Sequence, residues 1–365
     1  MQDRDILCTS FINQSAWANA QQIALPGDAS SRRYIRLIDG EKKALLMDVP
    51  QDSDGGECKE EASPEERKSA GYNACARLAG ANIKRFTDIA NALRANGIHA
   101  PEIFDIDTIN GFAIIEDLGA DVFAQSIRGG VSEALLYEAA IDVLLKIATL
   151  DRQQFSDLGL LTYDNIAMEA EVALLTQWYW PHKKGAALAS ALEDEYQQIW
   201  RSILSQIGNP STLVLRDYHA ENLLWMDAAT DDNATDNAAR GIERVGVIDF
   251  QDALIGSPVY DLVSLLEDAR RDVPVDLAQR MKKRYFDRVQ ITSDLVDLDA
   301  EYAILGAQRN AKILGIFARL ANRDGKLRYL DLVPRVEGHF RRNLDHPILL
   351  PVRQFLVKHI PELEL

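Results

Sequence analysis

Two short polar segments, each flanked by apolar runs, constrain the fold of this chain more than any other feature. Residues 215–225 read LRDYHAENLLW, and residues 245–252 read VGVIDFQD. The apolar flanks have the length and character of buried strands, so the polar residues between them fall at strand ends. Polar groups held at the ends of buried strands form a rigid and partly dry site.

The polar residues of these segments are the set that phosphoryl transfer from ATP requires. Asp217 can accept the proton of an acceptor hydroxyl, while Asn222 and Asp249 offer a neutral and a charged oxygen to Mg²⁺. Taken alone, Asp217 is equally a turn-forming residue at a strand end. Its combination with Asn222 and Asp249 favours catalysis. We therefore predict a kinase that uses ATP and Mg²⁺.

Three further residues near these segments have supporting roles in this interpretation. His219 could act as a general base, but we predict that its ring supports the loop by bonding to neighbouring backbone. Asp261 is expected to head a helix and to accept hydrogen bonds from backbone N–H groups of the catalytic loop. Asp252 is either a neighbour of the metal or a loop residue, and we favour the loop role.

Charge and composition exclude several classes of function. Lys and Arg total 40 and Asp and Glu total 56, giving a net charge of −16, which argues against nucleic acid as a partner. Cys8, Cys58 and Cys75 show no metal-ligand or paired spacing, as is usual in a reducing cytosol. No run approaches the ~20 apolar residues of a membrane span, and the first residues lead into no signal sequence. We expect a cytoplasmic protein with a small-molecule substrate.

The first third of the chain alternates between strand-like runs and turns. We predict a five-stranded sheet, interrupted at 51–82 by a polar insertion that is helical from about Pro64. Residues 86–95 have apolar residues at helical spacing and end at a cap, Asn96-Gly97. The predicted strands are Ile23–Pro26, Arg33–Ile38, Ala44–Val49, Ile103–Ile106 and Phe112–Ile115.

The remainder of the chain is predicted to be mostly helical. Apolar stripes with a period of 3.6 residues cover Leu135–Leu150, Ala167–Tyr179 and Leu188–Ile207. Residues 227–240, rich in Asp, Asn, Ala and Thr, are predicted to form an exposed, mobile hairpin tip. A strand-rich first third joined to a helical remainder indicates an α+β architecture with two lobes.

These motifs resemble the catalytic and metal loops of the aminoglycoside phosphotransferase branch of the kinase-like fold. The resemblance implies a small β-rich N-lobe over residues 1–116 and a larger helical C-lobe over 117–365. It extends to residues 25–34 (LPGDASSRRY), 44–48 (ALLMD), 308–319 (QRNAKILGIFAR) and 323–330 (RDGKLRYL).

The combination of these blocks is most similar to the bacterial anomeric kinases of cell-wall recycling. Those enzymes phosphorylate N-acetylmuramate and N-acetylglucosamine at C1. The resemblance therefore implies an amino sugar as substrate, and a sugar 1-phosphate that a nucleotidyltransferase converts to a UDP-sugar.

The chain departs from the usual kinase pattern at the third strand. Kinases carry a Lys there, paired with a Glu on the following helix, whereas this chain has Met47 and, on the helix, Asp88. Lys43 shares a strand face with Met47, and Arg33 lies on the neighbouring strand. We predict that Arg33 or Lys43 contacts the phosphates of ATP.

The remaining nucleotide contacts are assigned to a turn and a hinge. Gly27, Ser30 and Ser31 lie in a small-residue turn that either approaches a phosphate or only connects two strands. By the resemblance, the segment containing Glu116 and Leu118 is the hinge, where a backbone donor and acceptor read adenine.

Substrate recognition is assigned to a locally basic segment. Residues 301–345 contain nine Lys or Arg and five Asp or Glu, giving 9 − 5 = +4. Arg309 or Arg319 could therefore anchor the carboxylate of N-acetylmuramate, unless the segment is a solvated helix face. Trp178 could stack on a sugar ring, although aromatic residues on helices are also typical of a core.

Two other functions fit parts of the sequence. A kinase for an aminoglycoside, choline or a similar amine would have the same catalytic residues, but the basic segment at 301–345 suits a cationic acceptor poorly. A pseudokinase that only binds nucleotide fits Met47 at the third strand, but Asp217, Asn222 and Asp249 argue against it.

Overall fold

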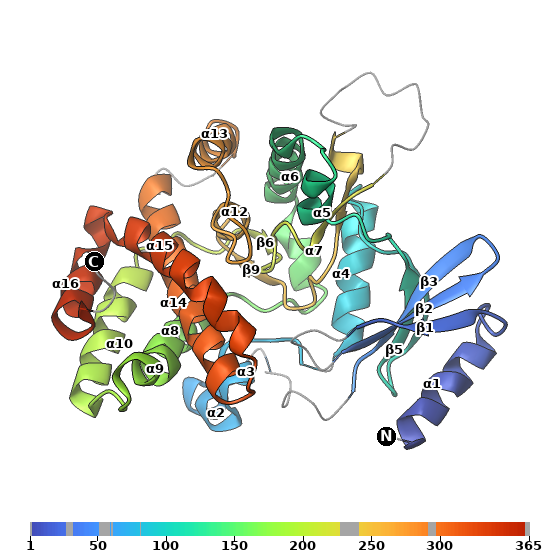
Figure 1. The fold of residues 1–365 in the computed structure, drawn as a ribbon, viewed down its shortest axis with the longest axis horizontal. Helices are drawn as coiled ribbons and strands as arrows, with labels where there is room; N and C mark the ends of the chain where they lie inside the picture. Colours follow the sequence, from blue (N-terminus) through green and yellow to red (C-terminus); the bar gives the residue numbers. More distant parts are fainter. Residues whose placement is uncertain are drawn as a thin grey trace. The chain divides into compact units, whose positions relative to one another are not determined.

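The computed structural model describes residues 2–26, 32–50, 59, 61–80, 82–226, 241–290 and 297–361 (Figure 1). Three predicted features lie outside the described residues: the turn with Gly27, Ser30 and Ser31, the first part of the insertion, and the hairpin tip at 227–240. The chain divides into two compact units. Unit 1 comprises residues 1–143, 153–160 and 220–253, and unit 2 comprises residues 144–152, 161–219 and 254–365.

Unit 1 contains the predicted five-stranded sheet, and all its neighbouring strands are antiparallel. The first strand was predicted at Ile23–Pro26, but it spans Gln21–Ala24, so both predicted ends are wrong. Backbone pairing with the next strand sets these ends, and because all four side chains are exposed, no hydrophobic pattern marks them in the sequence. In spatial order the strands are β1 (Gln21–Ala24), β2 (Arg33–Asp39), β3 (Lys42–Asp48), β5 (Phe112–Glu116) and β4 (Ile103–Asp107).

An N-terminal helix that the sequence did not predict, α1 (Gln2–Gln14), packs on one face of this sheet. Its Cys8 and Ile12 are buried against alternate residues of the central strands, among them Ala44 and Leu46. The same face buries Asp48 completely, and Arg4 of α1 neutralises this carboxylate. Helix α1 therefore covers the face of the sheet opposite to the one that contains the Met47 side chain.

The second part of the insertion is helical, as predicted. Helix α2 (Pro64–Ala70) begins with a capping box, in which Ser63 and Glu66 satisfy each other's backbone N–H groups, and with Pro64 in its first turn. It is followed by α3 (Tyr72–Cys75) and by α4 (Ile83–Ala95), which ends at Asn96 before a left-handed Gly97 (φ +66°). The predicted helix over residues 86–95 and its cap are thus confirmed.

The rest of unit 1 contains a β-hairpin, with Asn222 just before its first strand and Asp249 just after its second. Strands β7 (Leu223–Trp225) and β8 (Val245–Val247) pair antiparallel, and Val247 also donates to the carbonyl of His99. The helices in this part of the chain are α5 (Phe123–Arg128), α6 (Glu133–Ala148) and α7 (Arg152–Ser156), of which α6 was predicted. Helices α6 and α7 each contain a boundary between the units.

Unit 2 is built around a two-stranded ribbon and a set of helices. Strands β6 (Thr212–Val214) and β9 (Leu254–Gly256) pair antiparallel. The helical elements are α8 (Asn165–Leu174), the π-helix η1 (Leu175–Tyr179), α9 (Trp180–Lys184), α10 (Ser190–Leu204), α12 (Tyr260–Leu266), α13 (Val275–Phe286), α14 (Leu298–Asn322), the 3₁₀ turns η2 (Leu327–Leu332) and η3 (Pro347–Leu349), α15 (Val333–Leu344) and α16 (Leu350–His359).

Helix α14 is the centre of unit 2 and contacts α8, η1, α12 and α15. Its closest approach is at Gly315, where an added Cβ would lie 2.3 Å from the backbone of Leu174. Leu174 is the residue at which α8 changes into the π-helix η1. The predicted helix over 167–179 is therefore continuous, but its last five residues form the wider turns of a π-helix rather than an α-helix. Helix α14 packs against this segment.

Candidate active site

The loop with Asp217 follows β6 and is held by a buried carboxylate in unit 2. Asp261, in the first turn of α12, accepts hydrogen bonds from the backbone N–H groups of Leu215 (2.6 Å) and Arg216 (2.9 Å). These are the contacts that the sequence predicted for Asp261. Arg216 has φ +71°, a left-handed conformation that is rare for residues other than glycine. The hydrogen bonds to Asp261 stabilise this turn and so fix the half-buried Asp217 that follows.

Burial sets the protonation of Asp261. Removal from water raises its pKa to about 7, although the two backbone donors and Arg309 favour the charged form. The carboxylate of Asp217 lies near enough to raise the pKa of Asp261 further. Asp261 therefore binds a proton more readily than an aspartic acid in water does.

His219 is buried and has the properties of a neutral ring. Arg270 contacts its Nε2 at 2.8 Å, and burial together with the charge of Arg270 lowers the pKa of His219 to about 3. A ring with such a pKa does not serve as a base near neutral pH. The supporting role predicted for His219 therefore fits its surroundings, in which the guanidinium of Arg270 contacts the ring.

The side chain of Arg216 enters a buried polar network beneath the loop. It pairs with Glu171 of α8, which is fully buried, and lies over the ring of Tyr163 at 5.1 Å. Lys312 of α14 approaches the same carboxylate at 3.1 Å. Burial alone would raise the pKa of Glu171, but Lys312 and Arg216 hold it below its usual range. The sequence analysis missed this network because its members are far apart in the chain.

The two predicted metal ligands lie side by side in unit 1. Asp249 follows β8 with φ +61°, and the amide nitrogen of Asn222 is 3.4 Å from its Oδ2. Gln251 donates to Oδ1 of Asp249 at 2.9 Å, and the amide of Ile248 donates to the carbonyl of Asn222. Asp252 accepts from the backbone of Ala79, which supports the loop role that we favoured for it.

The chemistry of these two ligands fits Mg²⁺. Asn222 and Asp249 bring an amide oxygen and a carboxylate to one place, and the Asp249 side chain is 40% exposed. Mg²⁺ is usually bound by one or two such protein groups, with phosphate oxygens and water completing its shell. In the described part of the chain, no three His, Cys, Asp or Glu side chains form a group that could hold a metal ion by themselves. The site therefore suits a metal that is shared with a nucleotide.

A cation that the sequence analysis missed lies at the metal loop. Nη1 of Arg32 is 3.1 Å from Oδ1 of Asp249. Its neighbour Arg33 lies opposite Asp48 in the β2–β3 ladder and pairs with that carboxylate, 2.8 Å from Nε to Oδ2. Arg33 thus points to the face covered by α1. The phosphate contact proposed for Arg33 stays a prediction.

The other nucleotide candidates have the following positions. Lys43 is exposed near the start of β3. The carboxylate of Glu116 accepts from Arg94 (3.2 Å) and from the amide of Glu102 (3.0 Å), and its hydrogen bond with His99 lowers its pKa. Because the Glu116 side chain is tied to these neighbours, the predicted hinge would present its backbone to a base. Leu118 is buried.

The substrate candidates lie in unit 2 but are not brought together. Arg309 is buried on α14 and approaches the carbonyl of Glu267 at 3.4 Å, whereas Arg319 is half-buried ten residues further along the same helix. Ten residues of α-helix rise about 15 Å, so the two arginines do not serve one carboxylate together. Trp178 is half-buried on η1.

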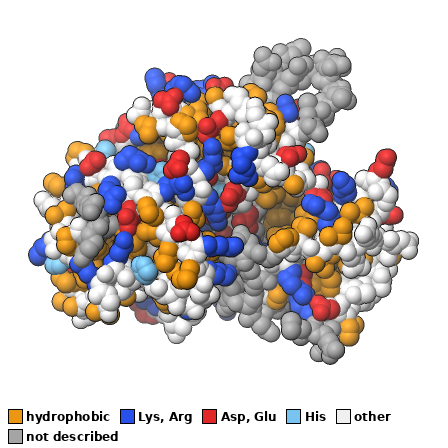
Figure 2. All heavy atoms as spheres, in the orientation of Figure 1, with side chains coloured by type: hydrophobic (Ala, Val, Ile, Leu, Met, Phe, Trp, Pro, Cys, Tyr) orange, Lys and Arg blue, Asp and Glu red, His pale blue; other side chains and the backbone are white. Residues whose placement is uncertain are grey.

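Much of the basic charge of residues 301–345 is paired. On the face shown in Figure 2, acidic side chains lie among the basic ones. Ion pairs in this segment join Lys312 to Glu171, Arg323 to Asp324, Arg335 to Asp272 and Arg341 to Glu337. Two of these partners, Glu171 and Asp272, lie outside the segment and are not counted in its net charge, so the value of +4 overstates the positive field available to a ligand.

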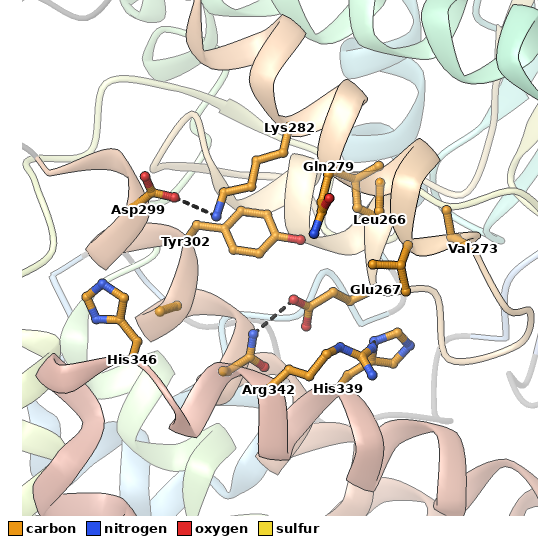
Figure 3. Close-up of a pocket in the computed structure, with 14 residues that line it drawn as sticks. Leu266, Glu267, Val273, Gln279, Lys282, Asp299, Tyr302, His339, Arg342 and His346 are labelled. Atoms are coloured by element: carbon orange, nitrogen blue, oxygen red, sulfur yellow. Dashed lines mark hydrogen bonds and ion pairs between the residues drawn. The ribbon is translucent and has the colours of Figure 1, made fainter.

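Unit 2 contains a cavity of about 500 Å³ between α13, α14 and α15. Its polar groups pair with one another. Lys282 pairs with Asp299 at 2.6 Å, both labelled in Figure 3, and Glu267 accepts from the amide of Asn343 at 2.9 Å. Among the described residues that line it, none belongs to the loop over 215–225. The cavity is therefore separate from the catalytic loop, and its polar lining is explained by internal pairing.

Comparison with known proteins identifies the family. Residues 21–293 match the model of the phosphotransferase enzyme family. The chain belongs to this family. The matched range includes Asp217, Asn222 and Asp249, and all of the chain from α14 onward lies beyond it.

This phosphotransferase has relatives that align over almost its full length. The N-acetylmuramate/N-acetylglucosamine kinase of Caulobacter vibrioides is 36% identical over 98% of this chain and 97% of that protein. The protein of the same name from Pseudomonas aeruginosa is 28% identical over 87% of this chain and 81% of its own length.

Solved structures confirm the predicted α+β kinase-like fold of the phosphotransferase. Choline kinase LicA from Streptococcus pneumoniae has a TM-score of 0.57 at 11% identity, covering 93% of this chain and 99% of that chain. The GDP and kanamycin complex of APH(2")-IIia has a TM-score of 0.55 at 14% identity, covering 91% and 99%. Within the described residues, no helix has the length and hydrophobicity that crossing a bilayer requires.

Proposed function

We propose that this phosphotransferase moves the γ-phosphoryl group of ATP to the C1 hydroxyl of N-acetylmuramate and N-acetylglucosamine. One observation carries the proposal: the relative from C. vibrioides, named for both sugars, is 36% identical and aligned over 97% of its length. A similarity that spans both units includes the residues that select a substrate as well as those that bind nucleotide.

Asp217 is the base in this proposal. The anomeric hydroxyl donates to its carboxylate, which orients the oxygen toward the γ-phosphorus. The carboxylate accepts the proton as the new O–P bond forms and the bond from the γ-phosphorus to the bridging oxygen of the leaving ADP breaks. The rigid turn at Arg216, fixed by Asp261, supports this role because a base must be held within hydrogen-bond reach of the proton. His219 is not the base, since Arg270 occupies its Nε2 and its pKa is about 3.

Asn222 and Asp249 hold Mg²⁺ in this proposal. The ion, when bound, neutralises charge on the β- and γ-phosphates. The contribution of the chain is to keep the two oxygen ligands adjacent, and Gln251 supports this by bonding to Oδ1 of Asp249. The left-handed backbone at Asp249 costs about 1–3 kcal/mol, which the surrounding contacts offset.

The wider assignments remain part of the same proposal. Residues 1–116 form the nucleotide-binding lobe and residues 117–365 the catalytic and sugar-binding lobe. Arg309, Arg319 and Trp178 are the candidate sugar contacts. The reaction takes place in the cytoplasm, where ATP is available, and a nucleotidyltransferase consumes the sugar 1-phosphate.

The test is a product analysis by ³¹P NMR. Purified protein is incubated with Mg²⁺-ATP and either sugar, and we expect a new phosphorus doublet coupled to the anomeric proton. Asp217→Asn should retain ATP binding but lose turnover by about 10²–10⁴-fold. The matched control is Asp276→Asn, an exposed Asp at the start of α13, which should behave as wild type. If neither sugar gives the doublet, the proposed substrate is wrong; if Asp217→Asn turns over normally, the assignment of the base is wrong.

A further inference from the structure

The third strand has Met47 at the position where kinases place a lysine, while Lys43, on the same strand face, is exposed near the start of the strand. Met47 is buried and lies opposite Tyr34 in the β2–β3 ladder, with the Tyr34 hydroxyl 3.4 Å from its sulfur. An apolar thioether supplies no charge to a phosphate. Another group must therefore perform the neutralisation that phosphoryl transfer requires.

Arg32 lies on this side of the sheet. It immediately precedes β2, and since Tyr34 is two residues further along, the alternation of strand side chains gives both residues the same orientation. Arg32 also forms a hydrogen bond with Tyr34 that lowers the pKa of that phenol, although burial dominates and raises it. The guanidinium ends 3.1 Å from Oδ1 of Asp249.

We propose that Arg32 replaces the missing third-strand lysine as the cation that contacts the phosphates of ATP. The guanidinium of Arg32 pairs with the carboxylate of Asp249. Asp249 would hold the metal, and the positive charge of Arg32 beside it would then be available to the phosphate oxygens. This inference rests on the nucleotide part of the proposed function, and it is independent of which sugar is the acceptor.

Burial and geometry favour an arginine in this role. The Arg32 side chain is only 13% exposed, so its charge is screened less than that of a surface residue. A guanidinium presents a planar fork of donors that matches two phosphate oxygens at once. The neighbouring Arg33 has the same chemistry but is engaged with Asp48 on the opposite face.

The test compares the binding of adenosine, ADP and ATP by calorimetry, without metal and with Mg²⁺. Arg32→Ala should weaken ATP binding by about 10–100-fold, the value of one or two charge-assisted hydrogen bonds, and leave adenosine binding within twofold. Arg32→Lys should recover part of the loss, because it keeps the charge but not the fork. Without nucleotide, Arg32→Ala should bind Mg²⁺ more tightly than wild type, since a competing cation has been removed from Asp249.

Two variants in unit 1 make the result specific. Arg4→Ala removes an arginine that also pairs with a buried carboxylate, Asp48, and should lower stability without changing the ratio of ATP to adenosine affinity. Arg33→Ala decides between the neighbouring arginines. The assignment would be overturned if Arg32→Ala weakened the binding of adenosine and of ATP by the same factor. It would also be overturned if only Arg33→Ala lowered the ratio of ATP affinity to adenosine affinity. If wild type forms the sugar 1-phosphate and Arg32→Ala matches it in ATP affinity, only this inference fails; if wild type does not bind ATP, the proposed function fails as well.

Discussion

Replacing Glu171 by Gln tests whether the buried network positions the catalytic loop. Glu171 is 0% exposed, and it accepts hydrogen bonds from Lys312 (3.1 Å) and from Gln308 (2.7 Å) in addition to its pair with Arg216. The glutamine is nearly isosteric, so packing is preserved and the main change is one unit of charge. Arg216 and Lys312 then lose the carboxylate that they share, and with it a negative charge that balances theirs.

The expected loss of stability follows from that uncompensated charge. Removing one partner of a buried ion pair costs about 3–5 kcal/mol. At roughly 2–4 °C per kcal/mol for a domain of 150–250 residues, the melting temperature should fall by about 6–20 °C. Because Arg216 is the residue next to Asp217 in a strained turn, kcat should fall more than KM for either substrate changes.

The assay combines thermal unfolding with steady-state kinetics and includes two comparisons. Glu169→Gln, on the same helix, breaks a surface pair with Arg201 and should change stability by less than about 1 kcal/mol. Adding Lys312→Met to Glu171→Gln removes one of the two cations and should restore part of the melting temperature. A Glu171→Gln variant within 1 kcal/mol of wild type would refute the reasoning, as would a double variant that is less stable than the single one.

Two further predictions concern stability. Gly315→Ala should lower the free energy of unfolding by about 2–3 kcal/mol in urea titrations, because its Cβ would lie 2.3 Å from the Leu174 backbone. The control is Gly338→Ala, whose Cβ would have no atom nearer than 3.7 Å and which should raise the free energy of unfolding by about 0.5–1 kcal/mol. If Gly315→Ala were also more stable than wild type, the close packing of α14 on Leu174 would be contradicted. Asp261 has a folded pKa of about 7, above that of the unfolded chain, so the stability it contributes is complete below about pH 4 and is lost as the pH rises to 7. Asp261→Asn should flatten this slope in unfolding measured from pH 4 to 8, and an unchanged slope would show that another group causes it.

The local patterns in the sequence predicted most of the fold. The capped helix that begins at Pro64 and the strand that precedes Asp249 depend on neighbouring residues, so they can be predicted from short stretches of sequence. Helix α1 could not be read in this way. Its apolar residues form no continuous helical stripe, and it is stabilised by packing on the sheet and by the pair of Arg4 with Asp48.

The arginine at the metal loop shows why register matters. The sequence suggested Arg33 or Lys43 as a phosphate contact and did not single out Arg32, which the structure brings to Asp249. Neighbouring residues of a strand point to opposite faces, so the pairing with β3 decides which of two adjacent arginines faces Asp48 and which does not. The register, with Tyr34 opposite Met47, depends on contacts between strands that a single-sequence pattern does not specify.

The division of the chain has a consequence for its synthesis. Unit 1 takes its last segment from residues 220–253, which contain both Asn222 and Asp249, and the chain passes from unit 2 to unit 1 between His219 and Ala220. A nascent chain therefore cannot complete unit 1 until residue 253 has left the ribosome. Any fragment that ends earlier lacks part of the β7–β8 hairpin or the residues after it, so Asn222 and Asp249 come together only late, when most of the 365 residues have already been made.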